Sequence, residues 1–182
     1  MSEQIQFNFQ GLVVPHPALD LTDDNTKAVY EIFDFYWRFG ADYEVGLDTA
    51  LSQPAHIKML AIRHSHIKPA EFTGEERKFG KQATERCWQE WESANWDPAM
   101  DAPSYRIPVS DEWVVYCVDS DRTACFLGYV PRLAHQYCAN GSPLLSAFMA
   151  SAENWFQSEN RHPMPFEEMP HLFGDKWRIA TR

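Results

Sequence analysis

Two short apolar runs in the second half of the chain predict the centre of its fold. Residues Trp113 to Val118 and Ala124 to Val130 are rich in β-branched and aromatic side chains, and the turn-forming residues 119–122 lie between them. Such a pattern is typical of a β-hairpin. Neither run alternates cleanly between apolar and polar positions, which predicts that both faces of both strands are covered. We therefore expect this hairpin at the centre of a sheet.

The N-terminal half of the chain carries one strand-like and one helix-like pattern. Residues 5–9 alternate between apolar and polar side chains, which predicts a strand with one buried face. A helix is predicted to begin after the capping residues 21–24 and to end at Gly40, and its sequence is apolar nearly all round. Residues 42–52 have a mixed pattern, in which Gly46 is the predicted break and a short helix is allowed on either side of it.

The middle of the chain contains one ambiguous segment and one clear helical pattern. Residues 57–67 fit either a helix or a strand; as a strand they would place His64 and His66 on one face and Arg63 on the other. Residues 73–96 begin with a capping-box signature and continue with apolar residues at helical spacing, so a helix is predicted there.

Two further helices and an irregular tail are predicted after the hairpin. Residues 131–138 indicate a short helix, and Ser142 with Pro143 forms a typical start for a longer one with an apolar face. The proline-rich tail from about residue 160 predicts no regular structure, with Trp177 as a candidate anchor.

Length and composition favour one α+β domain spanning residues 1–182, with a small antiparallel sheet and packed helices. The chain is 45% hydrophobic, which suits a single core. It has no apolar run long enough for a membrane span and no secretion-signal pattern at its start, so we expect a cytoplasmic protein that does not bind membranes. Its four cysteines lack metal-site spacing and are interpreted as small buried hydrophobes.

The net charge of −10 is concentrated at one end, because residues 1–50 hold nine acids and two bases. This pattern favours a solvated acidic face over a docking surface for a basic partner, and both interpretations stay open. The second one leads to an alternative function, a non-catalytic acidic interaction protein such as an immunity or inhibitor protein. No pattern indicates that the chain binds DNA by itself.

Several polar residues near the predicted strands are expected to converge, and they could cleave RNA. Metal-free cleavage through the ribose 2′-hydroxyl needs a base, an acid and a cation that stabilises the phosphorane. Histidines suit the first two roles and arginine suits the third. The candidates are Arg63, His64, His66, Asp111, Tyr116 and His135, with Arg122 in the hairpin turn as an additional one.

A zinc site is the less favoured interpretation of the same region. It would use His64, His66, His135 and Cys138, but the spacing does not define a ligand set. We therefore expect no metal and no cofactor.

A series of short motifs runs in a fixed order through most of residues 5–157. In chain order these motifs are Leu21-Thr22; Phe33, Tyr36, Arg38 and Gly40; Gly46-Leu47-Asp48; Arg63 with His66-Ile67; Ser110-Asp111 with Val114-Val115-Tyr116-Cys117; His135; and Ala152-Glu153 with Trp155. Their order and spacing resemble those of the YafO-type toxins of bacterial toxin-antitoxin pairs, which are ribosome-dependent mRNA interferases.

The resemblance implies a RelE-like toxin fold, a strand at residues 57–67 and a helical insertion at residues 69–104. It also implies an endoribonuclease that acts on mRNA at the ribosome, needs no metal and is restrained by a cognate antitoxin. Arg63, His66, Asp111 and His135 match the family's pattern and are the implied site residues. In this scheme His66 and His135 exchange protons, Arg63 binds the phosphate, and Asp111 either orients a histidine or supports the loop.

Overall fold

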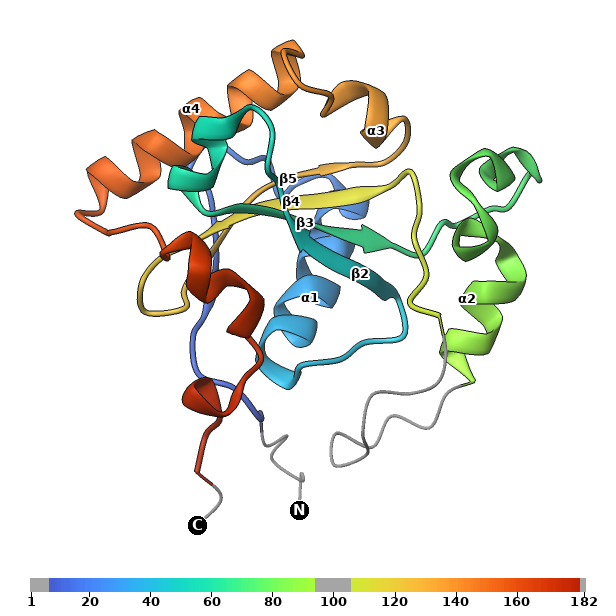
Figure 1. The fold of residues 1–182 in the computed structure, drawn as a ribbon, viewed down its shortest axis with the longest axis horizontal. Coiled ribbons are helices and arrows are strands. Elements are labelled where there is room, and N and C mark those ends of the chain that lie inside the picture. Colours follow the sequence, from blue (N-terminus) through green and yellow to red (C-terminus); the bar gives the residue numbers. More distant parts are fainter. Residues whose placement is uncertain (1–6, 94–105, 181–182) are drawn as a thin grey trace.

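The computed structural model describes residues 7–93 and 106–180, which form an α+β fold as predicted. Its sheet has the strand order β1-β5-β4-β3-β2 (Figure 1). All neighbouring strands are antiparallel except β1 and β5, which are parallel, so the sheet is mixed rather than purely antiparallel. The strands are β1 (Val13–Pro15), β2 (Val45–Ala50), β3 (Ile62–Ile67), β4 (Trp113–Val118) and β5 (Ala124–Val130).

Helices cover both faces of this sheet. The α-helices are α1 (Asp24–Phe39), α2 (Glu85–Glu92), α3 (Ala134–Tyr137) and α4 (Pro143–Ser158). Short 3₁₀ turns are η1 (Ala55–Leu60), η2 (Glu75–Phe79), η3 (Lys81–Ala83), η4 (Phe166–His171) and η5 (Asp175–Trp177). Helix α1 packs on one face, and α3 and α4 lie on the other (Figure 1). None of the helices in the described part of the chain is long and apolar enough to cross a membrane.

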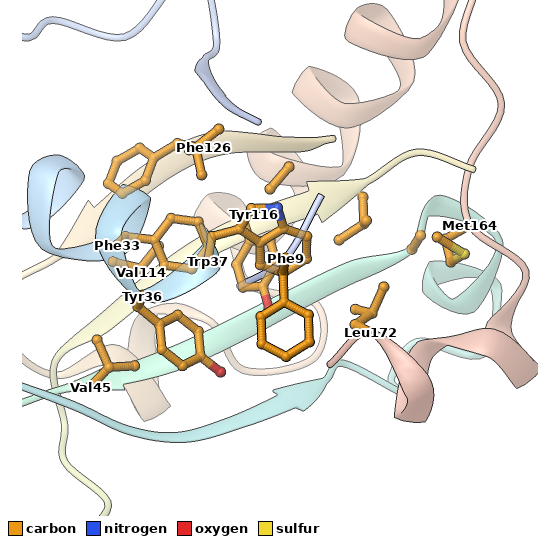
Figure 2. Close-up of a cluster of buried hydrophobic side chains, with 14 of the residues drawn as sticks. Phe9, Phe33, Tyr36, Trp37, Val45, Val114, Tyr116, Phe126, Met164 and Leu172 are labelled. Carbon is orange, nitrogen blue, oxygen red and sulfur yellow. The ribbon is translucent and has the colours of Figure 1, made fainter. Parts of the chain in front are cut away.

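The predicted hairpin is confirmed at both strands and at its central position. Every residue of β4 is buried, because α1 covers one of its faces and α4 the other. On the α1 face, the ring centroids of Phe33 and Tyr116 are 4.6 Å apart, and Phe126 lies 5.9 Å from Phe33 (Figure 2). Such aromatic contacts bury large apolar areas and fix how α1 lies on the sheet.

The caps of the two long helices are also confirmed. The Asp23 carboxylate accepts a hydrogen bond from the Thr26 amide at 2.7 Å, and Gly40 ends α1 with a positive φ of 97°. The Ser142 hydroxyl accepts from the Leu145 amide at 3.2 Å and begins α4. These contacts satisfy amide groups that a helix start leaves without partners.

Two segments differ from the sequence-based predictions. The predicted break at Gly46 is wrong and the short helix allowed beside it does not form, since Val45–Ala50 is strand β2, which pairs with β3. The predicted long helix over residues 73–96 is wrong in its first half: Glu76 caps only the 3₁₀ turn η2, and Gly80, with a φ of 96°, separates it from α2. The end of that prediction lies outside the described residues.

For two other segments, residues 57–67 and residues 5–9, the structure shows which elements form. Residues 57–67 divide into the end of the 3₁₀ turn η1 and the strand β3, so the strand interpretation holds for Ile62–Ile67. The strand predicted at residues 5–9 lies partly outside the described residues, and its described part forms a single bridge from Phe9 to Arg178. Between residues 160 and 180, the C-terminal segment forms the 3₁₀ turns η4 and η5 and two isolated bridges, and Trp177 is buried as an anchor. All four cysteines are free and buried.

Candidate functional site

Strand β3 divides the candidate residues between the two faces of the sheet. Ile62, His64 and His66 face α4, while Arg63 and Ser65 face α1, as the alternation of a strand requires. The structure therefore brings His64 and His66 together and separates both from Arg63.

Asp111 and His135 form a hydrogen-bonded pair at the surface next to this histidine face. Asp111 lies just before β4 and His135 lies in α3, and the Asp111 carbonyl accepts from the Ala134 amide at 3.1 Å. One carboxylate oxygen of Asp111, Oδ1, accepts from the His135 amide at 2.9 Å and lies 2.7 Å from His135 Nδ1. Because a carboxylate only accepts, Nδ1 carries the proton, and Nε2 is left as the basic nitrogen.

Aromatic rings hold the His135 imidazole while leaving it accessible. The ring stacks on Phe79 at a centroid distance of 4.4 Å and an angle of 13°, and it meets the Trp113 ring in an edge-to-face contact with a centroid distance of 4.7 Å. The side chain of His135 is 40% exposed, and that of Asp111 is 19% exposed. An imidazole with one nitrogen bound to a carboxylate and the other free can act as a general base.

His66 lies beside His135, with ring centroids 6.1 Å apart, but its ring is the other tautomer. Its Nδ1 receives the Ser110 amide at 2.8 Å and the Trp113 indole N–H at 3.1 Å. The Ser110 carbonyl oxygen is also 2.8 Å from Nδ1, but two donors converge on this nitrogen, so we assign it as the acceptor and place the proton on Nε2. Burial lowers the pKa of His66 to about 4, which makes the ring neutral at pH 7.

His64 is also buried, on the same face of β3 as His66. Its ring lies over Trp113 at a centroid distance of 3.9 Å, and its Nδ1 is buried without a hydrogen-bond partner. Burial, followed by the nearby His66, lowers its pKa to about 3. His64 therefore supports the packing of Trp113 and is neutral at physiological pH.

The opposite face of β3 holds a closed polar network centred on Asp48. Arg63 contacts the Asp48 carboxylate through Nε at 2.8 Å and Nη2 at 2.7 Å. Tyr116 donates to the same carboxylate at 2.6 Å, Ser65 at 2.7 Å and Tyr36 at 3.2 Å. Burial raises the pKa of both tyrosines, and although burial alone would lower the pKa of Arg63, the adjacent Asp48 raises it.

This network leaves Arg63 no free face for a substrate. The residue is only 7% exposed, and Nη1 donates to the Met169 carbonyl at 3.1 Å. The role in phosphate binding that the resemblance implies for Arg63 therefore does not fit its position. Tyr116, another candidate, belongs to the same buried network.

Arg122 also has a structural position. It is fully buried and donates to the backbone carbonyls of Leu172 at 2.6 Å, Trp37 at 2.8 Å and Gln10. Its guanidinium lies 4.2 Å from the Trp37 ring centroid and 4.9 Å from that of Phe173. Burial lowers its pKa to about 10, so it stays charged and ties three distant segments together.

Sequence reasoning missed Asp48, Phe79 and Trp113 as members of these clusters. The motif Gly46-Leu47-Asp48 was a usable signal for Asp48, because an acid in that motif has to meet a cation if it is buried. Phe79 and Trp113 carry no such signal. Within residues 7–93 and 106–180, no group of three or more histidine, cysteine or acidic side chains is arranged to hold a metal ion.

Comparison of this chain with protein-family models, curated protein sequences and solved structures gave no match. The resemblance to YafO-type toxins therefore rests on the residues of this chain alone.

Proposed function

We propose that this chain is a cytoplasmic toxin that cleaves mRNA at the ribosome and is restrained by a cognate antitoxin. The observation that carries the proposal is the accessible pair of Asp111 and His135, in which a carboxylate fixes the tautomer and leaves Nε2 free. A base of this kind suits cleavage through the ribose 2′-hydroxyl, which needs no metal.

In the proposed reaction, His135 Nε2 takes the proton from the 2′-hydroxyl. The 2′-oxygen then attacks the adjacent phosphorus, the bond to the 5′-oxygen breaks, and water supplies the proton to the leaving oxygen. Asp111 keeps His135 in the reactive tautomer and stabilises the imidazolium that forms. A positioned general base of this kind typically contributes about 10²–10⁴ in rate.

Lys78 takes the role that faces the phosphate. His66 is buried and neutral at pH 7, so it neither contacts the phosphate nor exchanges a proton; its Nδ1 accepts from the Trp113 indole and so helps to hold the ring that lies beside His135. Lys78 is exposed, and its Nζ lies 5.0 Å from the centroid of Phe79, the ring that stacks on His135. It supplies a cation on the histidine side of the sheet, in place of the buried Arg63.

The positions of the family-like motifs support the proposed RelE-like fold and toxin function. Arg63 and His66 lie on β3, Asp111 precedes β4, and His135 lies in α3 beyond the hairpin. These elements adjoin one another in the sheet and bring the motif histidines to one face.

The test is inducible expression of the full chain in a bacterium, with two reporter messages that differ only in the start codon. We expect growth arrest and cleavage of the translated message, while the message without a start codon stays intact. Normal growth with verified folded protein and intact messages would contradict the proposal and favour the non-catalytic acidic interaction protein.

A further inference from the structure

The outer edge of β5 is covered for only part of its length. Strand β1 pairs with Ala124 to Phe126, and the last hydrogen bond on this edge runs from the His16 amide to the Phe126 carbonyl at 3.0 Å. The chain then turns away from the sheet. Among the described residues, no strand pairs with the outer side of residues 127–130.

The other edge of the sheet differs at the corresponding place. There the Leu47 amide of β2 donates to the Pro108 carbonyl at 2.9 Å, so a passing segment covers the edge. Open strand edges present unpaired backbone groups and are normally protected in this way. Residues 127–130, the open half of β5, are therefore the part of the sheet edge at which a further strand can pair.

A groove of about 690 Å³ lies along this open edge. Residues 127–130 line it, together with Leu19 on the side of α1 and Tyr137, Leu144 and Phe148 on the side of α3 and α4. Tyr137 is 46% exposed, although it is a large apolar side chain. An extended segment placed here would gain backbone hydrogen bonds from β5 and apolar contacts from both walls.

The groove carries negative charge along the wall formed by the start of α1. Asp20 and Asp23 both line it and are exposed. Hydrogen bonds from Thr22 and Thr26 lower the pKa of these two carboxyls, so both are charged at neutral pH. Arg132 is the cation among the lining residues, on the opposite wall. The acidic wall favours a basic occupant, and it opposes a second copy of a chain whose net charge is −10.

We infer that the open edge of β5 binds an extended, basic segment of a partner protein, which adds a strand to the sheet beside Leu127–Val130. Apolar residues of that segment would contact Leu19, Leu144 and Phe148, and its lysines or arginines would face Asp20 and Asp23. This inference does not depend on RNA cleavage, because it uses neither Asp111 nor His135.

The experiment uses the full chain labelled with ¹⁵N and a nine-residue peptide in which valine alternates with lysine and threonine. We expect saturable binding, with the largest shifts at the amides of residues 127–130 and of Asp20 and Asp23. The same peptide with glutamate in place of lysine should bind at least about tenfold more weakly. A peptide that is N-methylated at its three central residues should not bind, because it cannot pair with a strand edge.

A double variant tests the acidic wall, and a single Asp→Asn substitution outside the groove is its control. The double variant Asp20→Asn with Asp23→Asn should weaken binding of the lysine peptide about threefold to tenfold. Asparagine keeps the cap of α1, so folding is maintained. The control Asp175→Asn removes an acid that is fully exposed and outside the groove, and it should leave the affinity unchanged.

The inference would be overturned by absence of binding, by equal binding of the glutamate and lysine peptides, or by shifts centred on β2. Self-association of the free chain through the amides of residues 127–130 would also contradict it, since the occupant would then be a second copy.

Discussion

The two faces of β3 hold polar clusters of opposite character. On the α1 face, Arg63 and Asp48 are buried, and the carboxylate is surrounded by hydrogen-bond donors. On the α4 face, His135 is accessible, while His64 has an unpartnered buried nitrogen and the buried His66 accepts two N–H donors at Nδ1. Residues adjacent in sequence thus belong to different environments.

This difference separates structural from chemical roles. A closed ion-pair network offers no group to a substrate, and removing one partner leaves a buried charge. A histidine whose Nδ1 is hydrogen-bonded to a carboxylate and whose Nε2 is free can take up and release a proton at Nε2. We therefore assign Arg63, Tyr116 and Arg122 to stability, and the proposed cleavage uses His135 with Asp111.

The largest expected effect concerns the closed face. Arg63→Met should lower the free energy of unfolding by about 3–5 kcal/mol, because it leaves the Asp48 carboxylate buried without its cation. Urea denaturation followed by tryptophan fluorescence measures this loss. The exposed Arg86→Met is the matched control and should change stability by less than about 0.5 kcal/mol. If Arg63→Met kept full stability but lost RNA cleavage, the separation of the two faces would be wrong.

A smaller effect is expected from the buried histidines. The folded-state pKa values of about 4 for His66 and about 3 for His64 lie below the ordinary value of 6.5. Unfolded chains therefore bind protons that the folded chain does not, and stability present above pH 6.5 is lost as the pH falls toward these values. Between pH 7 and pH 5 we expect a loss of about 2–4 kcal/mol.

The variant His64→Phe sharpens this prediction. It keeps a ring against Trp113 and removes one titrating group, so it should lose only about half as much stability between pH 7 and pH 5. Replacing the exposed His56 with glutamine should leave the pH dependence as in the wild type. Identical pH dependence in His64→Phe and the wild type would show that His64 is not held neutral by the fold.

The smallest expected effect concerns the carboxylate of the open face. Asp111→Asn keeps an oxygen that accepts from the His135 amide but removes the charge that stabilises the imidazolium. We expect cleavage of translated mRNA to fall about tenfold to a hundredfold, with a shift in unfolding free energy below about 1 kcal/mol. Cleavage at the wild-type rate would remove Asp111 from the mechanism.

The sequence predicts the elements whose signals are local. The hairpin follows from two apolar runs around a turn, and α1 and α4 follow from their caps at Asp23 and Ser142. Strand β2 has no such signal, because its place depends on pairing with β3, in which Asp48 lies opposite Ser65 and forms an ion pair with Arg63. The break at Gly80 was missed because helical spacing continues on both sides of it.

The candidate site is predictable in part for the same reason. Strand alternation places His64 and His66 on one face and Arg63 on the other, as expected for β3. The hydrogen bond between Asp111 and His135 depends on how α3 packs beside the start of β4. The stacking of Phe79 on His135 depends on the path of the long connection between β3 and β4. These contacts join residues far apart in sequence, and periodicity carries no information about them.

The most direct measurement compares the His135→Ala variant with a matched His56→Ala control in the inducible expression assay. Both replace one exposed histidine, and thermal unfolding verifies that both are folded. We expect His56→Ala to arrest growth and cleave the translated reporter like the wild type. His135→Ala should reduce cleavage at least about a hundredfold and restore growth. Undiminished cleavage by folded His135→Ala would contradict the assignment of chemistry to the open face of the sheet.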